Sequence, residues 1–346
     1  MTYKQLNDSY TERTMIWHLG VDAGFFTEFR SMCDAMLYCL ENKIRFKLYS
    51  ADANFAGVTG AGWTEYFATF CDTVDETFNS KYNRHKLPSF AHILNSALKE
   101  RRPSLIAWKM KSIVNECIGR IAARRAYGRG TLLNVDIKKQ SSGQHRVAEL
   151  GIEGNDVQSY KAIAEIAWHL NEHTKKRTEE LIGDLHLPPK YVSCQLRGGD
   201  KIVETAILSE RIYMDEIARC THLRDIFVLT DDYAIFNRLR NGYPEYRFYT
   251  LCSASEHGYV NKEYIHSEAA AKHERTLRFL ASMEAILQSS FFVGTMTTGP
   301  SLFAHAMLHP RCSVVDYPTE RLNDVYVMTM AERVAASKKY LNGEMP

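Results

Sequence analysis

The sequence predicts an α/β protein with two domains built on parallel sheets, and three observations support this. Its 346 residues are 45% apolar and 24% charged, which suits two globular domains of ordinary size. Short apolar runs alternate with stretches of helical periodicity along most of the chain. A proline pair, Pro188 and Pro189, separates two such alternating regions and marks the expected domain junction.

The first region opens with a strand, a glycine-containing turn and a helix. Residues 14–20 form a short apolar run, and residues 44–49 alternate apolar and charged side chains as a half-buried strand does. Between them, apolar residues recur at helical spacing: Phe29, Cys33, Met36, Leu37 and Leu40. This order predicts a βαβ unit and therefore parallel strands.

Residues 81–139 carry the one marked charge asymmetry of a chain whose formal charge is only +2. This segment holds fourteen Lys or Arg residues against three acids. It is either a set of solvated helix faces or the lining of a cleft for an anionic ligand. Nucleic acid is disfavoured as a ligand, because no aromatic stacking pattern accompanies the charge.

The remaining elements follow in order. Residues 147–185 are predicted to be helical throughout, ending in the glycine and proline residues of 183–189. The expected strands beyond are 191–196, 225–230, 246–251, 290–294 and 312–316, with helices at 209–220, 234–240, 272–288 and 300–307. The predicted domains are 1–186 and 187–318, and a helical tail, 319–346, could pack back across the junction.

The cysteines and the apolar segments exclude several classes of protein. The eight cysteines are spread without a C-x-x-C pair, so reduced thiols are expected rather than a zinc knuckle or disulfide framework. The first residues are polar and lack the apolar core of a secretory leader. Glycine, proline and polar residues interrupt the uncharged stretch 285–310, so it is not expected to span a membrane. These features favour a cytoplasmic protein.

Polar side chains follow three strands of the second region, where a doubly wound sheet binds its ligands. Arg197 comes after the first strand, within a two-glycine turn, and can offer a phosphate a guanidinium fork or form a surface ion pair. Asp231 and Asp232 could bind a metal or ribose hydroxyls, or cap the next helix. Thr297 and Thr298 stand at a helix N-terminus, either as an anion site or as a capped turn.

Arg197 and the threonine turn are expected to face the same crevice, because both follow strands of one doubly wound sheet. A diphosphate is the simplest ligand for a guanidinium opposite a helix N-terminus. The sequence contains neither a P-loop nor a G-x-G-x-x-G fingerprint, which lowers the case for a kinase or a dehydrogenase.

Four runs, at 197–201, 226–232, 243–248 and 291–298, resemble in order and spacing the motifs of the GDP-fucose-dependent α1,6-fucosyltransferases. The resemblance covers about 191–315. It implies a GT-B architecture, in which two Rossmann-like domains face each other across a cleft and the C-terminal one holds most of the nucleotide-sugar donor. It also implies an inverting reaction without a metal or other cofactor, so that Asp231 and Asp232 bind no metal.

The resemblance also assigns the reacting groups. Arg197 matches the arginine that binds the donor β-phosphate, and Thr298 matches a serine contacting the same phosphate. Lys201 matches a lysine beside the family's proposed catalytic acid residue. The general base of the family falls nominally one position from Glu204, which is therefore the preferred base, with Asp200 as a second candidate.

The sequence departs from the family pattern at positions that bind the nucleotide-sugar donor in that family. Gln195 replaces a histidine and Gly198 replaces a second arginine of the first motif. The aspartate that binds guanine in the family falls on Ser282, with Glu284 two residues further on. Arg197, Thr297, Asp231 and Asp232 complete the expected donor-binding set.

The predicted activity is transfer of L-fucose from GDP-fucose to a hydroxyl of a carbohydrate or glycoconjugate. The expected partners are that donor and acceptor, with no nucleic acid and no transmembrane segment, although the basic segment 81–139 could contact an anionic acceptor at a membrane surface. Two alternatives stay open: a GT-B transferase that uses another nucleotide sugar, and a binding protein that has lost catalysis.

Overall fold

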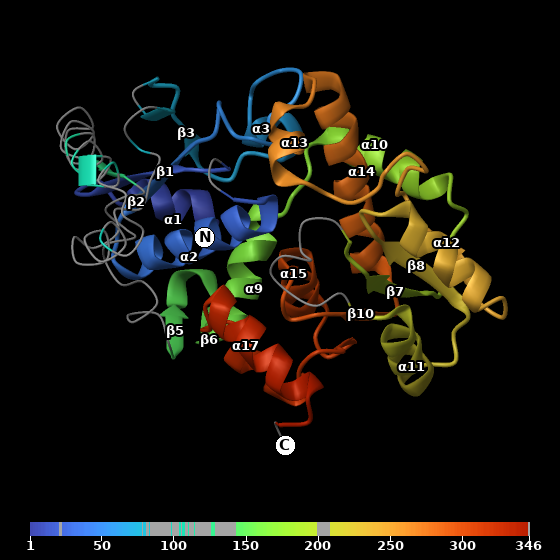
Figure 1. The fold of residues 1–346 in the computed structure, drawn as a ribbon. Helices are drawn as coiled ribbons and strands as arrows, with labels where there is room; N and C mark the ends of the chain where they lie inside the picture. The colour runs from blue at the N-terminus through green and yellow to red at the C-terminus, as the bar shows by residue number, and fades with distance from the viewer. Residues whose placement is uncertain are drawn as a thin grey trace. The chain divides into compact units, whose positions relative to one another are not determined.

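The computed structural model describes residues 1–20, 23–77, 143–198 and 208–344, together with short pieces between 79 and 128. The chain divides into two compact units, Met1–His169 and Leu170–Pro346 (Figure 1). The predicted junction lay at residue 186, but helix α10 (Glu172–Gly183) packs against helix α14 (Ala269–Gln288) and so belongs to the second unit. Most of the basic segment 81–139 lies outside the described residues.

The first unit contains a parallel sheet in the order β3-β2-β1-β4. Its strands are β1 (Thr14–His18), β2 (Arg45–Tyr49), β3 (Asp72–Thr73) and β4 (Ala126–Gly128). Its helices are α1 (Tyr3–Ser9), α2 (Phe25–Glu41), α3 (Trp63–Tyr66) and α9 (Asp156–Ala167). Strands β1 and β2 pair in parallel and flank α2 in the chain, so the predicted βαβ unit is present.

The prediction of one helical stretch over 147–185 is wrong. An antiparallel hairpin of β5 (Gln144–Val147) and β6 (Ile152–Asn155) precedes α9, with the short helix η1 (Ala148–Leu150) at its turn. Gly151 and Gly154 have φ angles of 66° and 152°, conformations that a helix does not contain. The side chains of Asn155 and Asn171 then cap α9 and α10 separately.

Aromatic side chains make up much of the core of the first unit. Phe26 stacks on Trp168 with ring centroids 5.5 Å apart, and Trp63 stacks on Phe67 at 4.1 Å. Phe29 contacts both tryptophans. Because such rings bury large apolar areas, they fix α2, α3 and the end of α9 to one another.

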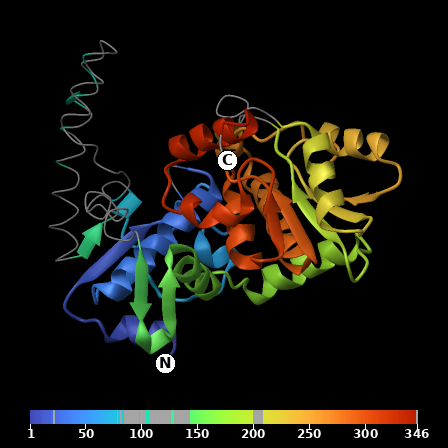
Figure 2. The ribbon, with the colours of Figure 1, turned by 90° about the horizontal axis from the view of Figure 1, so that it is seen from below.

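The second unit contains a five-stranded parallel sheet in the order β11-β10-β7-β8-β9. The strands are β7 (Val192–Gln195), β8 (Asp225–Leu229), β9 (Arg247–Tyr249), β10 (Phe291–Gly294) and β11 (Cys312–Val314). Its further helices are α11 (Glu210–Cys220), α12 (Tyr233–Gly242), α13 (Asn261–His266), α15 (Gly299–Leu308), η3 (Thr319–Arg321), α16 (Leu322–Val325) and α17 (Met330–Leu341). All five strands expected from the sequence are present (Figure 2), whereas α13 was not expected.

The order of this sheet fixes where a ligand can bind. The chain builds β8 and β9 on one side of β7, and then crosses to build β10 and β11 on the other side. The switch point therefore lies between β7 and β10, and ligands of doubly wound sheets bind at the carboxyl ends of the strands there.

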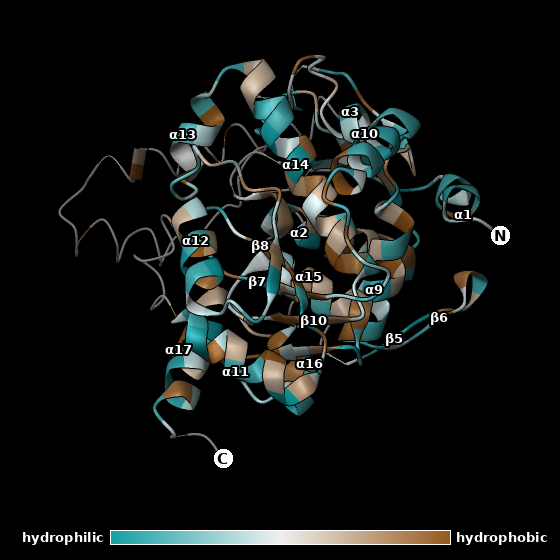
Figure 3. Ribbon diagram, turned by 90° about the vertical axis from the view of Figure 1, so that its right-hand side faces the viewer, coloured by the Kyte–Doolittle hydropathy of each residue, from teal (hydrophilic) through white to brown (hydrophobic). Residues whose placement is uncertain are grey.

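Helix α15 starts at this switch point and is buried along most of its length. Helices α12 and α17, by contrast, alternate hydrophilic and hydrophobic residues along their length (Figure 3). Gly294 lets α15 approach β10 closely, since a Cβ there would lie 1.8 Å from the Ser301 hydroxyl oxygen. That oxygen accepts a hydrogen bond of 2.8 Å from the Thr295 backbone N–H. None of the described helices is both long and apolar enough to cross a lipid bilayer.

Replacing His305 of α15 by leucine is expected to stabilise the protein by about 1–3 kcal/mol, the cost of burying an unsatisfied polar group. His305 is 3% exposed, and neither ring nitrogen has a hydrogen-bond partner among the described residues. Thermal denaturation at pH 7.5 measures the effect. The exposed His222→Leu is the control, and an unchanged melting temperature in His305→Leu would contradict the prediction.

The same substitution is expected to change the pH dependence of stability. Burial lowers the pKa of His305 to about 3, whereas an unfolded histidine titrates near 6.5. As the pH falls below about 6.5, the unfolded chain takes up a proton that the folded chain refuses, so wild-type stability falls by up to about 1.4 kcal/mol per pH unit. His305→Leu should show a smaller loss of melting temperature between pH 7.5 and pH 5.

Candidate functional site

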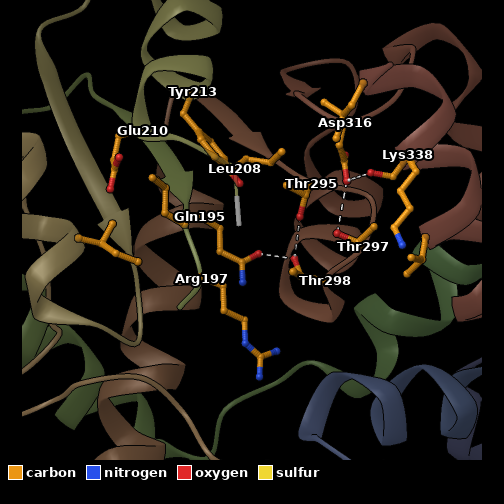
Figure 4. Close-up of a pocket in the computed structure, with 15 residues that line it drawn as sticks. Gln195, Arg197, Leu208, Glu210, Tyr213, Thr295, Thr297, Thr298, Asp316 and Lys338 are labelled. Atoms are coloured by element: carbon orange, nitrogen blue, oxygen red, sulfur yellow. Dashed lines mark hydrogen bonds between the residues drawn. The ribbon is translucent and has the colours of Figure 1, made fainter. Parts of the chain in front are cut away.

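A cavity in the second unit opens at the switch point between β7 and β10 (Figure 4). The ends of three strands line it, together with residues of helices α11, α12 and the C-terminal helix α17. The polar residues from the strand ends are Gln195, Arg197, Thr295, Thr297, Thr298 and Asp316. The structure thus brings the predicted arginine and the predicted threonine turn together in one cavity, although a hundred residues separate them.

Arg197 is held in place by two neighbours. Its Nε lies 3.5 Å from Oδ2 of Asp231, and its guanidinium carbon lies 5.5 Å from the ring centroid of Tyr259. The Arg197 side chain is 23% exposed, so it reaches the cavity without being sealed in the core. A partly desolvated guanidinium of this kind is a strong donor to a phosphate.

The two aspartates after β8 have separate structural roles. Asp231 accepts backbone N–H bonds from Gly198 at 2.7 Å and from Tyr259 at 3.0 Å, which ties the loop carrying Arg197 to the loop carrying Tyr259. Asp232 accepts from the backbone N–H of Ala234 at 2.9 Å and caps α12. Of the roles left open by the sequence, helix capping therefore describes Asp232.

Gly198 leaves little room for a larger residue at its position. A Cβ there would lie 3.1 Å from the Cβ of Asp232, which is closer than most such contacts. The arginine that the resembling family has at this position would require Asp232 to move. The chain instead uses the Gly198 N–H as a donor to Asp231.

The start of α15 lies beside the cavity, because its N-cap residue Thr298 is one of the lining residues. Thr298 is the N-cap residue, yet its side chain makes no capping bond. Its hydroxyl instead donates to Oε1 of the buried Gln195 at 2.7 Å. The first N–H groups of α15 are therefore not satisfied by the cap side chain, and the helix dipole favours an anion beside them.

Asp316, which follows β11, joins the threonine turn to α17. Its Oδ1 accepts the Met296 N–H at 2.7 Å, and its Oδ2 accepts the hydroxyls of Thr297 at 3.3 Å and Ser337 at 3.2 Å. Asp316 is 1% exposed, and burial raises its pKa to about 6 despite these three bonds. Sequence reasoning missed this residue, although an acid at the end of a predicted strand was the available indication.

Replacing Asp316 by alanine is expected to destabilise the second unit by about 2–3 kcal/mol, because it leaves the buried Met296 N–H without an acceptor. Asp316→Asn keeps an oxygen there and should retain most of the stability at pH 7.5. Thermal denaturation compares the two variants. Equal melting temperatures for wild type and Asp316→Ala would refute a structural role for this carboxylate.

Asp316 should also give a pH dependence opposite to that of His305. Its folded pKa of about 6 lies above the unfolded value near 3.9, so its contribution to stability is complete below about pH 4 and is lost as the pH rises to about 6. The melting temperature of wild type minus that of Asp316→Asn should therefore be larger at pH 4.5 than at pH 7.5.

Ser282 and Glu284, which the resemblance placed at the guanine, lie on α14 and are absent from the cavity lining. The Ser282 side chain is buried, and its hydroxyl donates to the Arg278 carbonyl oxygen at 2.7 Å. The Ser282 hydroxyl therefore donates its hydrogen bond within α14.

Asp200, Lys201 and Glu204 lie outside the described residues. The chain leaves the described part after Gly198 and returns to it at Leu208. Arg197 and Leu208, on either side of this segment, both line the cavity.

The first unit has a polar cluster at the corresponding edge of its own sheet. His18, the last residue of β1, is fully buried, with Nε2 at 2.6 Å from Oδ1 of Asp52 and Nδ1 at 2.9 Å from the Asn83 carbonyl oxygen. Ser80 donates its hydroxyl to the other oxygen of Asp52 at 2.7 Å. Sequence reasoning missed this cluster, which the histidine ending a predicted strand could have indicated.

Comparison with known proteins identifies the fold. No protein-family model matches the chain, and no curated protein is similar to it in sequence. A crystal structure of NodZ alpha-1,6-fucosyltransferase soaked with GDP-fucose has a TM-score of 0.50 at 11% identity, covering 86% of this chain and 93% of that one.

Two further structures are similar at slightly lower scores. Fucosyltransferase NodZ from Bradyrhizobium has a TM-score of 0.49 at 11% identity, covering 85% of this chain and 93% of that one. FUT1 from Arabidopsis thaliana, in complex with GDP, has a TM-score of 0.48 at 10% identity, covering 90% and 71%.

The chain therefore has the α/β fold of the GT-B class, as the sequence predicted, with two units that each contain a parallel sheet. This fold is similar to that of the NodZ alpha-1,6-fucosyltransferase structure.

Proposed function

We propose that this protein transfers L-fucose from GDP-fucose to a hydroxyl of a carbohydrate or glycoconjugate, with inversion at the anomeric carbon. One observation carries the proposal: Arg197 and the uncapped start of α15 line the same cavity at the switch point of the second sheet. A fold shared with a fucosyltransferase that was soaked with GDP-fucose supports the choice of donor.

The cavity suits the charge that develops during such a transfer. As the bond between sugar and phosphate breaks, negative charge accumulates on the leaving diphosphate. The Arg197 guanidinium lines the cavity and the positive end of the α15 dipole lies beside it at Thr298, so both are in place before the reaction and stabilise this charge without reorganising. Asp231 and Tyr259 hold the guanidinium in its orientation.

The acceptor hydroxyl must lose a proton as it attacks. Glu204 is the proposed general base and Asp200 the second candidate, since both belong to the segment that starts beside Arg197. A carboxylate of this kind removes the proton while the new glycosidic bond forms on the face opposite the leaving group. In this proposal Lys201 contributes positive charge near the same groups.

We propose that the reaction requires no metal or other cofactor. The acids that could have held a cation are engaged elsewhere: both oxygens of Asp231 accept backbone N–H bonds, and Asp232 caps α12. Arg197 then supplies the charge that a divalent ion supplies in other transferases. Action in the cytoplasm, with the basic segment 81–139 meeting an acceptor at a membrane surface, completes the proposal.

The motif resemblance favours an α1,6 linkage within this class. One observation favours a donor base other than guanine: the Ser282 hydroxyl donates a hydrogen bond within its own helix. A GT-B transferase with another nucleotide sugar is therefore the alternative, and donor preference distinguishes the two.

A thermal-shift panel with GDP, UDP, ADP, GDP-fucose and GDP-mannose, each with and without EDTA, tests the proposal. A ligand that binds only the folded state raises the melting temperature according to its concentration relative to Kd. Stabilisation by GDP and GDP-fucose that persists in EDTA is expected. Selective stabilisation by UDP would replace the donor, stabilisation lost in EDTA would refute metal independence, and stabilisation by none would refute the function.

A further inference from the structure

The C-terminal helix α17 forms one wall of the phosphate cavity. Val334, Ser337, Lys338 and Leu341 all line it. Their spacing of three or four residues places them on one face of the helix, so α17 presents a continuous stripe to the cavity. This stripe combines two apolar side chains with one hydroxyl and one ammonium group.

Two contacts hold α17 against the rest of the second unit, and a capping box stabilises its first turn. Ser337 is 7% exposed and donates its hydroxyl to Asp316, the same carboxylate that binds the Met296 N–H of the threonine turn. Ala336 packs against the buried cluster that includes Met296. The side chain of Thr329 caps the first turn of α17 in a capping box with Glu332. The position of α17 is therefore linked, through Asp316, to the position of the threonine turn.

The proposed ligand carries more negative charge than Arg197 alone can balance. Gly198 supplies no second guanidinium, although the resembling family has an arginine at that position. Lys338 lines the cavity and, in Figure 4, extends from α17 toward Thr297, while Arg197 extends from the opposite side of Thr298.

We propose that Lys338 is a second cation of the donor site and that its ammonium group binds the diphosphate of the nucleotide sugar. This inference rests on the proposed function for the identity of the ligand. Lys338 lies at the exposed edge of the cavity, where a lysine acts as a point charge and tolerates several ligand positions. Lys338, on α17, thus supplies the positive charge that the second arginine of the first motif supplies in the resembling family.

Isothermal titration of the full-length protein with inorganic pyrophosphate and, separately, with GDP tests the inference. Lys338→Ala should weaken binding of both ligands about three- to tenfold, as expected for a partly exposed charged contact. Lys338→Arg should restore most of the affinity. Lys339→Ala is the matched control, because Lys339 is the next residue of the same helix, is exposed and lies outside the cavity lining.

The outcomes separate the inference from the proposed function. Weaker binding in Lys338→Ala alone, at an unchanged melting temperature, supports the inference; equal affinity in Lys338→Ala and Lys339→Ala overturns it and leaves the fucosyltransferase proposal intact. If wild type binds pyrophosphate in a Lys338-dependent way but binds no GDP, the cation site stands and the donor assignment fails. Binding of neither ligand by wild type overturns both.

Discussion

Arg197→Ala is expected to lower kcat/KM for fucosyl transfer by about 10²- to 10³-fold, the effect of removing one preorganised donor to developing negative charge. The guanidinium lines the cavity at the switch point and is oriented by Asp231 and Tyr259. Its interaction strengthens as charge moves onto the diphosphate, so the loss should appear in kcat as well as in KM. Initial-rate kinetics with GDP-fucose and an acceptor measure both constants.

Two further variants distinguish a specific phosphate contact from a general loss of charge. Arg197→Lys keeps the charge but loses the planar fork, and should retain an intermediate activity. Arg211→Ala removes an exposed arginine of α11 that pairs only loosely with Asp215, at 3.5 Å, and should behave as wild type. Activity of Arg197→Ala within threefold of wild type would eliminate the proposed leaving-group role.

Glu204→Gln is expected to reduce turnover by about 10²- to 10⁴-fold, the usual contribution of a general base. Glutamine keeps the size of the side chain but cannot accept the proton of the acceptor hydroxyl. Because the base acts on the acceptor, the affinity for GDP should stay unchanged while kcat falls. Titration with GDP alongside steady-state kinetics separates these two quantities.

Asp200→Asn decides between the two candidate carboxylates. If Glu204 is the base, Asp200→Asn should lose far less turnover, and the acid limb of its pH–rate profile should remain. The reverse result, with Glu204→Gln active and Asp200→Asn inactive, would transfer the role to Asp200. Normal turnover in both variants would rule out this segment as the source of the base.

Patterns within single elements explain why much of the fold was predictable. Strands β8 and β10 are short apolar runs bounded by turn residues, and their flanking helices carry apolar stripes at helical spacing. The error at 147–185 shows the limit of this reasoning. Residues 144–155 contain apolar residues compatible with a helix, but Gly151 and Gly154 adopt positive φ angles and the segment forms a hairpin. Asparagine caps then start two separate helices in place of one.

The candidate site was predictable only in part. Arg197 and Thr298 could be placed at strand ends from the sequence, and the parallel topology brings such ends to one edge of a sheet. The roles of Asp316 and Lys338 could not be foreseen, because nothing local to β11 or α17 reveals which loop each would meet. Ser282 shows the opposite case. Counting along the chain predicted its hydroxyl to lie at the donor, but that hydroxyl donates to the carbonyl oxygen of Arg278 within α14.

The sequence by itself determined the class of fold, the order of the strands in the chain and the chemical types of residue at each strand end. Tertiary structure alone decided which of those residues meet: Thr298 with Gln195, Asp316 with Met296, and Ser337 with Asp316. The physical reason lies in the range of the forces. Hydrophobic periodicity and capping act within a few residues, whereas a binding site forms when packing of the whole sheet brings distant strand ends together.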